Sequence, residues 1–471
     1  MLRSLLAVAV AVAATLAGCA LNPPPARDEL AGQALPNLKV PAEWAAQRAP
    51  SSAVGDRWIT EFNDPQLYRL VQEALAYNPD LQVAAARVEQ AVAYVRLAGG
   101  TLYPQVSLLA RGGGKLGGDG TGLQGVGVFL NWELDLWGRI RSGREAAQGQ
   151  YVSAALDAEY ARQSLASLVA KSWFLATEAR LQKAIAVDMA AASARQLQLA
   201  QDRLRVGSGD EYEVTLARAS LATYQDSVKN LDLAYQQSLR ALEALAGRYP
   251  AAAVDVPAQL AAMPKPVPVG MPSELLERRP DVVAAERRVA AAFYRVEEAK
   301  AARLPRISLT AAVTSLSSSL FVLQEKDNPV ISAGGTLLQP LFLGGQLESQ
   351  VDIRTAEQKQ AVAEYGRTGA KAFSEVENAL SAELTLEERE RILAQVVAEN
   401  TRALELASIR HRVGSGDLRA VQQQSLALYA ARTALLRVQS ERLVQRINLY
   451  LALGGSFEER PIEPQPGEPR Q

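Results

Sequence analysis

The chain has 471 residues, 48% of them hydrophobic, and its 50 basic and 51 acidic residues leave a formal net charge of −1. Because both signs are spread along the chain without a basic run, nucleic acid is a poor candidate partner. The sequence contains one Cys and one His, which excludes an internal disulfide and a zinc site built from several such ligands. We therefore expect neither a bound metal nor a cofactor.

The N-terminus has the pattern of a secretory signal followed by a lipidation site. The apolar run at 5–17 is too short to span a bilayer but has the length of a signal-peptide core. It ends at Leu16-Ala17-Gly18-Cys19, which resembles a bacterial lipobox. We expect cleavage before Cys19 and acylation of that residue, palmitate included. Ala20, in place of Asp, favours sorting to the outer membrane. A simple secretory signal that happens to contain Cys is the alternative.

Three short motifs occur twice in the rest of the chain, separated by 201 or 207 residues. They are Pro79-Asp80 with Pro280-Asp281, residues 103–108 with 304–309, and Arg205–Asp210 with Arg412–Asp417. Such repetition indicates a duplicated unit. The six additional residues of the second copy are expected in the polar loop 324–329. Between the copies lies a connector, 250–272, whose six prolines exclude a helix or a central strand.

Each copy is expected to contain a helix, a β-hairpin and a long helical hairpin, in that order. Asn78-Pro79 is typical of a helix start, and residues 126–137 alternate between apolar and polar or small side chains, as a strand does. Residues 150–206 contain neither Gly nor Pro and favour a continuous helix. The predicted divisions begin with a signal peptide at 1–18 and a lipid-anchored segment at 19–63. The first repeat, 64–249, has a β-hairpin at 103–137 and a helical hairpin at 141–247. After the connector at 250–272, the second repeat, 273–455, has a β-hairpin at 305–343 and a helical hairpin at 346–453, and a flexible tail follows at 456–471.

The two hairpins supply four strands, too few to close a barrel, because known single-chain membrane barrels begin at about eight strands. An open sheet in lipid would leave its edges unpaired, so several chains would have to pool their strands. Tyr429, Leu436, Leu443 and Tyr450 lie seven residues apart, which is typical of coiled-coil packing. An ordinary helical bundle would show the same spacing.

The segment from Met271 to Val282, with Arg278-Arg279-Pro280-Asp281 in it, resembles the hallmark of the TolC family of outer-membrane factors. The closest branch is that of the NodT/OprM-type efflux lipoproteins. Residues 64–81 resemble the first-helix pattern of the family, and the resemblance extends from about 55 to 455. It implies an α+β membrane protein, in which a homotrimer shares a long α-helical barrel and a 12-stranded transmembrane β-barrel, four strands from each chain.

By this resemblance the chain would not be an enzyme. It would be the outer-membrane channel of a tripartite efflux pump, a passive exit duct for drugs and other small amphiphiles. The expected partners are a periplasmic adaptor (membrane fusion) protein, an inner-membrane transporter of RND type, and outer-membrane lipid. The chain would be lipid-anchored in the outer membrane of a Gram-negative bacterium and extend into the periplasm. Two alternatives remain: a type I secretion exit duct, and a periplasmic coiled-coil lipoprotein scaffold without a pore, which would have no use for the strands.

The two Arg-Val-Gly-Ser-Gly-Asp turns are expected to end one helix in a left-handed glycine and to cap the next with Asp. In the resembled family such turns form the periplasmic tip, where the adaptor docks and the channel is gated. The implied docking residues are Arg205, Val206, Gly207, Arg412, Val413 and Gly414. The acidic gate ring of related channels does not carry over, because Gln423 stands at its position. Asp417 and Arg419 are the nearest charged candidates, and we predict a latch between them. His411 is expected to be a surface or packing residue rather than a sensor.

Overall fold

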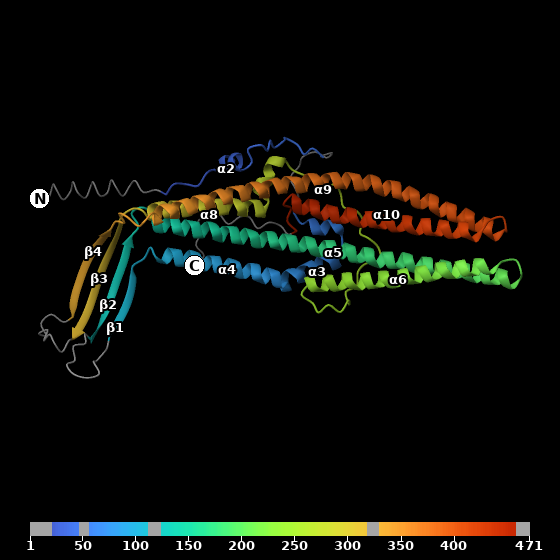
Figure 1. Ribbon diagram of the computed structural model, residues 1–471, viewed down its shortest axis with the longest axis horizontal. Helices are drawn as coiled ribbons and strands as arrows, with labels where there is room; N and C mark the ends of the chain where they lie inside the picture. The colour runs from blue at the N-terminus through green and yellow to red at the C-terminus, as the bar shows by residue number, and fades with distance from the viewer. Residues whose placement is uncertain (1–20, 47–55, 112–123, 318–328, 458–471) are drawn as a thin grey trace. The chain divides into compact units, whose positions relative to one another are not determined.

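The computed structural model describes residues 21–46, 56–111, 124–317 and 329–457 (Figure 1). The predicted lipidation site, Cys19, and nearly all of the predicted loop insertion lie outside these residues. The chain folds as two compact units. Unit 1 comprises Met1–Leu38, Ala84–Asp157 and Asp281–Gly369, and unit 2 comprises Lys39–Val83, Ala158–Pro280 and Ala370–Gln471.

The two copies of the repeat form helices of matching length. The first copy contains α4 (Pro79–Gly100), α5 (Arg139–Arg205) and α6 (Glu211–Leu245), and the second contains α8 (Pro280–Ala301), α9 (Gln346–Arg412) and α10 (Leu418–Ala452). Their lengths are 22, 67 and 35 residues in both copies. As predicted, Pro79 follows a cap, because the Asn78 side chain accepts a hydrogen bond from the backbone N–H of Asp80 at 2.9 Å.

Unit 1 contains an antiparallel sheet in the order β1-β2-β3-β4. Its strands are β1 (Gln105–Arg111), β2 (Gln124–Leu134), β3 (Arg306–Ser317) and β4 (Val330–Leu338). The central pair, β2 and β3, joins the two copies, with Leu134 opposite Ile307. Many of the large apolar side chains on the sheet are exposed in the single chain, among them Val106, Leu108 and Ile331.

Two strands end earlier than the sequence analysis predicts. β2 ends at Leu134 rather than at 137, because the Asp135 carboxylate accepts hydrogen bonds from the backbone N–H groups of Ile140 and Arg141, both at 2.9 Å. The chain therefore turns into α5 before the apolar alternation stops. β4 ends at Leu338, and the Pro340 that follows has no N–H for a strand ladder.

Unit 2 has an aromatic core built from three parts of the chain. A short 3₁₀ helix, η1 (Trp58–Phe62), precedes α3 (Pro65–Tyr77). The Trp58 ring stacks on Tyr450 of α10 with centroids 5.8 Å apart, and Phe62 contacts Phe174 of α5 at 5.2 Å. Asp64 caps α3 and also accepts a hydrogen bond from the indole N–H of Trp173 at 2.8 Å. The segment 19–63, predicted only as a lipid-anchored stretch, thus contributes η1 to this core.

The Pro-rich connector has no helix or strand from residue 250 to 271, as predicted, and unit 2 holds it by hydrogen bonds. Buried Glu243, near the end of α6, accepts bonds from the backbone N–H groups of Ala252, Ala253 and Val254 at 2.6, 2.6 and 3.0 Å. Arg446 of α10 donates to the carbonyl oxygen of Pro264 at 2.9 Å. Short helices follow the connector: η2 (Pro272–Glu274) and α7 (Leu275–Arg278).

The conspicuous Arg279 of the sequence hallmark is a buried structural residue of unit 2, with a side chain only 1% exposed. It donates to Glu375 at 2.6 Å and to the carbonyl oxygen of Ala452 at 3.2 Å, and it lies over the ring of Tyr160. In the part of the chain that the structure describes, none of the helices combines the length and the apolar character needed to cross a bilayer.

Candidate gate at the helical tip

The two helical hairpins of unit 2 end in turns of the same geometry. Gly207 and Gly414 have φ values of 77° and 78°, a backbone conformation that side chains disfavour. After each glycine a serine N–H returns to the preceding helix, to the carbonyl oxygen of Arg203 in one turn and of Arg410 in the other, both at 2.9 Å. The predicted left-handed glycines are confirmed.

Both helices that leave these turns begin with an aspartate cap, as predicted. Asp210 accepts from the backbone N–H of Glu213 at 2.8 Å, and Asp417 accepts from that of Arg419. Four helices then pack together behind the turns. Their shared apolar cluster consists of Ala200, Val214, Ala217, Leu418 and Val421, with Leu197, Leu404 and Ala407 beside it. The two hairpins are thereby held as one tip.

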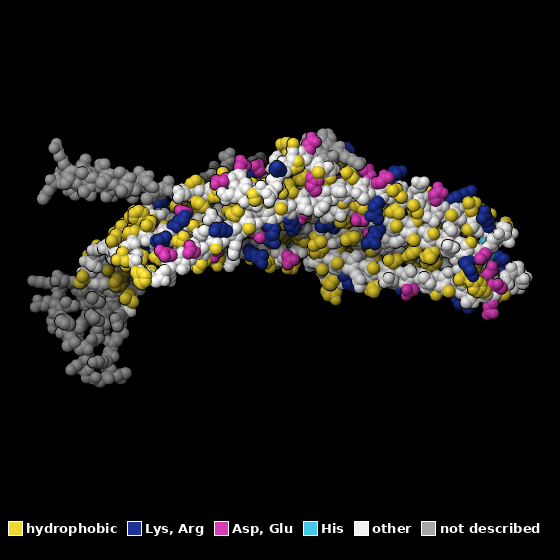
Figure 2. Space-filling model, turned by 45° about the horizontal axis from the view of Figure 1, so that its top comes forward, with side chains coloured by type: hydrophobic (Ala, Val, Ile, Leu, Met, Phe, Trp, Pro, Cys, Tyr) yellow, Lys and Arg dark blue, Asp and Glu magenta, His cyan; other side chains and the backbone are white. Residues whose placement is uncertain are grey.

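All six residues that the sequence assigns to adaptor docking are exposed at this tip. Val206 and Val413 are 75% and 71% exposed, which is unusual for valine side chains. Arg205 pairs with Asp202 of its own helix, at 2.5 Å. Acidic and basic side chains gather over the ends of the helical hairpins on the face shown in Figure 2. The tip therefore presents two apolar side chains among charges of both signs.

Arg419 makes a contact from the second hairpin to the first. Its guanidinium donates to the Tyr212 hydroxyl at 2.6 Å, and it lies 5.6 Å from the centre of the Tyr212 ring. The Tyr212 hydrogen bond is the main cause that raises the pKa of Arg419, and the Asp417 carboxylate adds to it. The side chain of Asp417, the predicted partner of Arg419, accepts a hydrogen bond from the backbone N–H of Arg419. Gln423 lies further along α10 and is exposed.

His411 and Arg203 make a second contact between the hairpins. His411 is only 3% exposed. Its Nε2 and Nδ1 lie 3.2 and 3.4 Å from Nη1 of Arg203, and its Nδ1 lies 3.3 Å from the carbonyl oxygen of Gly416. Arg203 also donates from Nη2 to the carbonyl oxygen of Ser208 at 3.3 Å. His411 is thus a buried residue with polar partners.

Sequence reasoning missed Tyr212 and Arg203 as tip residues, although the repeat carries a signal for both contacts. At the 207-residue offset, Tyr212 corresponds to Arg419 and Leu204 corresponds to His411. Each of the two cross-hairpin contacts therefore includes a position at which the two copies differ in chemistry. A comparison of the copies residue by residue, rather than a search for shared motifs, would have pointed to them.

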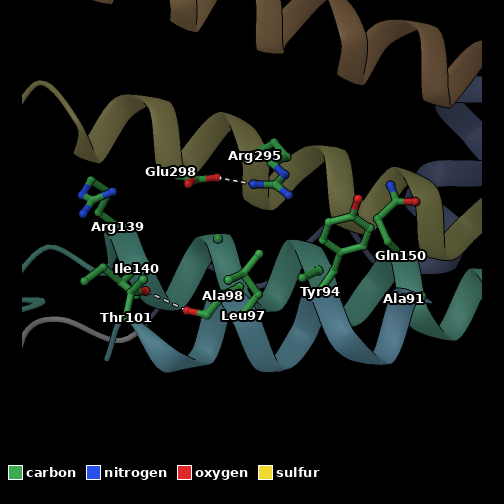
Figure 3. A pocket seen from close by; sticks show the side chains of 12 residues that line it. Ala91, Tyr94, Leu97, Ala98, Thr101, Arg139, Ile140, Gln150, Arg295 and Glu298 are labelled. Atoms are coloured by element: carbon green, nitrogen blue, oxygen red, sulfur yellow. Dashed lines mark hydrogen bonds and ion pairs between the residues drawn. The ribbon is translucent and has the colours of Figure 1, made fainter. Parts of the chain in front are cut away.

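Unit 1 contains a cavity of about 500 Å³ between α4, α5 and α8 (Figure 3). Its apolar lining consists of Ala91, Tyr94, Leu97, Ala98, Ile140 and Ala147. Arg295 and Glu298 form an ion pair at 2.8 Å on its wall, and Arg139 pairs with Glu133 at the same distance. Because these charges are already paired, the cavity offers a ligand mainly apolar contacts. Among the described residues, no three His, Cys, Asp or Glu side chains lie together as metal ligands.

Known proteins share this architecture. A family model described as outer membrane efflux protein matches residues 70–248 and 271–455. The pyoverdine export outer membrane protein OpmQ of Pseudomonas putida is 31% identical, over 89% of this chain and 92% of OpmQ. The cation efflux system protein CusC of Escherichia coli is 28% identical, over 95% of this chain and 98% of CusC.

A solved structure shares the fold. The outer-membrane channel OprN superposes with a TM-score of 0.82 at 28% sequence identity, over 89% of this chain and 97% of OprN. The fold class predicted from the sequence, with long paired helices and four strands per chain, is confirmed by this likeness.

Proposed function

We propose that this chain, which belongs to the outer membrane efflux protein family, forms a homotrimeric exit duct that is gated at its helical tip. The chain is an efflux channel of the Gram-negative outer membrane that extends into the periplasm, as the motif resemblance predicted. Its family is one of channels and not of enzymes.

The strand arrangement supports the trimer. β1 and β4 each pair with one neighbour in the described chain, so each leaves one edge available. Pairing β4 of one copy with β1 of the next satisfies these edges, and three copies close the shared sheet without an end. The exposed apolar residues of the sheet, such as Val106 and Ile331, would then face lipid.

The observation that carries the gate is the contact of Arg419 with Tyr212. This contact connects the start of α10 with the start of α6, directly after the turns of the two hairpins. Outward movement of the hairpins would break it and widen the tip. Asp417 keeps its capping role in this proposal, and its negative charge favours the cationic Arg419 beside it.

A periplasmic adaptor is the partner that we propose for the exposed turns. Its docking would pull on Arg205–Gly207 and Arg412–Gly414 and so open the tip, while an inner-membrane transporter, of RND type in our proposal, supplies the energy. Lipid anchoring through Cys19 is also part of the proposal. The mixture of exposed valines and charges at the tip suits a protein partner.

Small amphiphiles are the substrate class that we propose. OpmQ is named for pyoverdine export and CusC for cation efflux, so family membership alone leaves the substrate open. The cavity of unit 1 has a mainly apolar lining and paired wall charges, which would suit molecules with a substantial apolar surface.

Planar-bilayer conductance of the full-length protein, together with its mass in detergent, tests the proposal. We expect a trimer that gives discrete current steps, and a higher open probability in Arg419→Ala. Arg402→Ala is the matched control, because this exposed arginine of α9 pairs along its own helix, with Glu405 at 2.6 Å. A monomer in detergent would contradict the duct, and an unchanged current in Arg419→Ala would contradict the gate.

A further inference from the structure

We infer that Arg203 and His411 form a proton-sensitive clasp between the two hairpins, which positions the closed tip and releases it on acidification. The inference rests on the gate proposed above and assigns these two side chains a positioning role in it. It is carried by the contact of a buried imidazole with a guanidinium and by a carboxylate oxygen next to the clasp, Oε2 of Glu213, that has no hydrogen-bond partner among the described residues.

The position of Arg203 against the ring bears on the protonation state of His411. Nη1 of Arg203 lies 3.2 Å from Nε2 and 3.4 Å from Nδ1, so it lies against the ring rather than on the lone-pair axis of either nitrogen. A guanidinium keeps its positive charge and has N–H donors only. Nδ1 lies 3.3 Å from the carbonyl oxygen of Gly416, to which a neutral ring can donate. A neutral His411 can therefore lie against this cation, whereas a protonated one would be repelled by it.

Protonation removes this arrangement. A second proton on the ring places a second positive charge beside Arg203, whose Nη1 is 3.2 Å from Nε2. Burial makes that arrangement more costly, because His411 is 3% exposed and water has little access to its ring. Imidazoles ordinarily titrate between about pH 5 and 8, within reach of a compartment that follows the external pH.

Arg203 has an alternative partner on its own hairpin. Oε2 of Glu213 is buried without a hydrogen-bond partner among the described residues. A Cβ built at Gly209 would lie 3.2 Å from that oxygen and 3.0 Å from Cβ of Arg203, so both side chains flank the same glycine. When His411 is protonated, Arg203 turns to Glu213. A bond between the hairpins is then exchanged for one within the first hairpin.

The other charged groups of the tip leave this exchange undisturbed. Asp210 and Asp417 are engaged as helix caps, and Arg419 is bound to Tyr212. Asp202 pairs with Arg205 on the exposed side of α5. The charged neighbours of His411 along α9 are Arg410 and Arg412, and both disfavour a further positive charge. Glu211, in the first turn of α6, is exposed, whereas Oε2 of Glu213 lies beside the same glycine as Arg203, so Glu213 is the carboxylate placed to receive Arg203.

Single-channel recording of the full-length trimer at about pH 7.5 and about pH 5.5 tests the clasp, because these values span the usual imidazole range. We expect the open probability to rise at least about fivefold at the lower pH, because two unit charges about 4 Å apart produce that factor in bulk water and a larger one where water has little access. His411→Gln keeps a carbonyl acceptor that cannot take up a proton, so its open probability should stay low at both pH values. His411→Lys carries a fixed charge and should stay high at both.

Arg402→Gln, which removes a charge from α9 away from the clasp, should respond to pH like the wild type. A wild-type channel without a pH response, or a full response in His411→Gln, would overturn the clasp while the duct remained. Absence of current steps in every variant would instead refute the proposed function. Should the His411 variants fail to form trimers, Glu213→Gln decides the matter, because it removes the acid-state partner. A full acid response in that variant would overturn the exchange.

Discussion

The attachment of the Pro-rich connector gives a prediction whose size can be worked from the structure. Glu243→Ala removes the carboxylate that accepts three backbone hydrogen bonds, from Ala252, Ala253 and Val254. Each bond to a charged group contributes about 1.5–3 kcal/mol when buried, and about 1 kcal/mol here, because water can replace the carboxylate on this half-exposed segment. Together the three bonds stabilise the attached connector by about 3 kcal/mol relative to the detached connector.

A change of about 3 kcal/mol corresponds to about a hundredfold rise in the population of detached connector. Limited proteolysis with elastase, which cleaves after small apolar residues, measures it directly at Ala252–Val254. When detachment and return are fast compared with cleavage, the cleavage rate follows the detached population. We therefore expect cleavage in Glu243→Ala to be about a hundredfold faster than in the wild type.

Two further variants make the comparison specific. Glu243→Gln keeps one acceptor oxygen without the charge and should fall between the wild type and Glu243→Ala. Glu399→Ala, at an exposed position of α9, should leave the cleavage rate unchanged. Equal cleavage of the connector in Glu243→Ala and the wild type would refute the reasoning, because it would mean that the three bonds contribute nothing to attachment.

Four further outcomes are expected. Tyr212→Phe should raise the open probability in bilayers, since Arg419 loses its hydroxyl acceptor but keeps the ring; a value equal to the wild type would place the latch elsewhere. Cys19→Ser should abolish fatty-acid labelling while trimers still form in detergent, and normal labelling would remove the lipidation site. Deletion of 324–329 should leave the trimer intact, and loss of the trimer would show that this segment is not a loop insertion. Asp64→Ala should destabilise the protein by about 2–4 kcal/mol in denaturant unfolding, because α3 loses its cap and the buried Trp173 indole loses its acceptor; a loss below about 1 kcal/mol would contradict this.

Local signals made the long helices and the tip turns predictable from the sequence. The stretch 150–206, free of Gly and Pro, lies almost wholly within α5, and Pro79 marks the start of α4, because both depend on backbone conformations that single residues control. The glycine at 207 needed no tertiary information either, since few other residues adopt its φ value.

Contacts between elements were not predictable in the same way. The alternation pattern extended β2 to residue 137, whereas Asp135 turns the chain by capping α5 from a distance of five residues. Arg419 was expected to meet Asp417, two positions away, yet its side chain reaches Tyr212 of the other hairpin. Which side chain meets which depends on how the hairpins pack, and a one-dimensional pattern does not contain that information.

The equal helix lengths of the two copies, 22, 67 and 35 residues, have a consequence for how such a tip can evolve. In the proposed trimer six hairpins of one size surround an axis. Each packs against its two neighbours along an interface, called a seam here, so there are six seams. Three seams lie within chains and contain Arg203 with His411 and Tyr212 with Arg419. The other three lie between chains, where the repeat brings Arg410 towards Leu204. A ring of six identical hairpins would have to change every seam at once. A tandem chain can alter one set and leave the other as it is, so that alternate seams can differ in strength and in their response to protons.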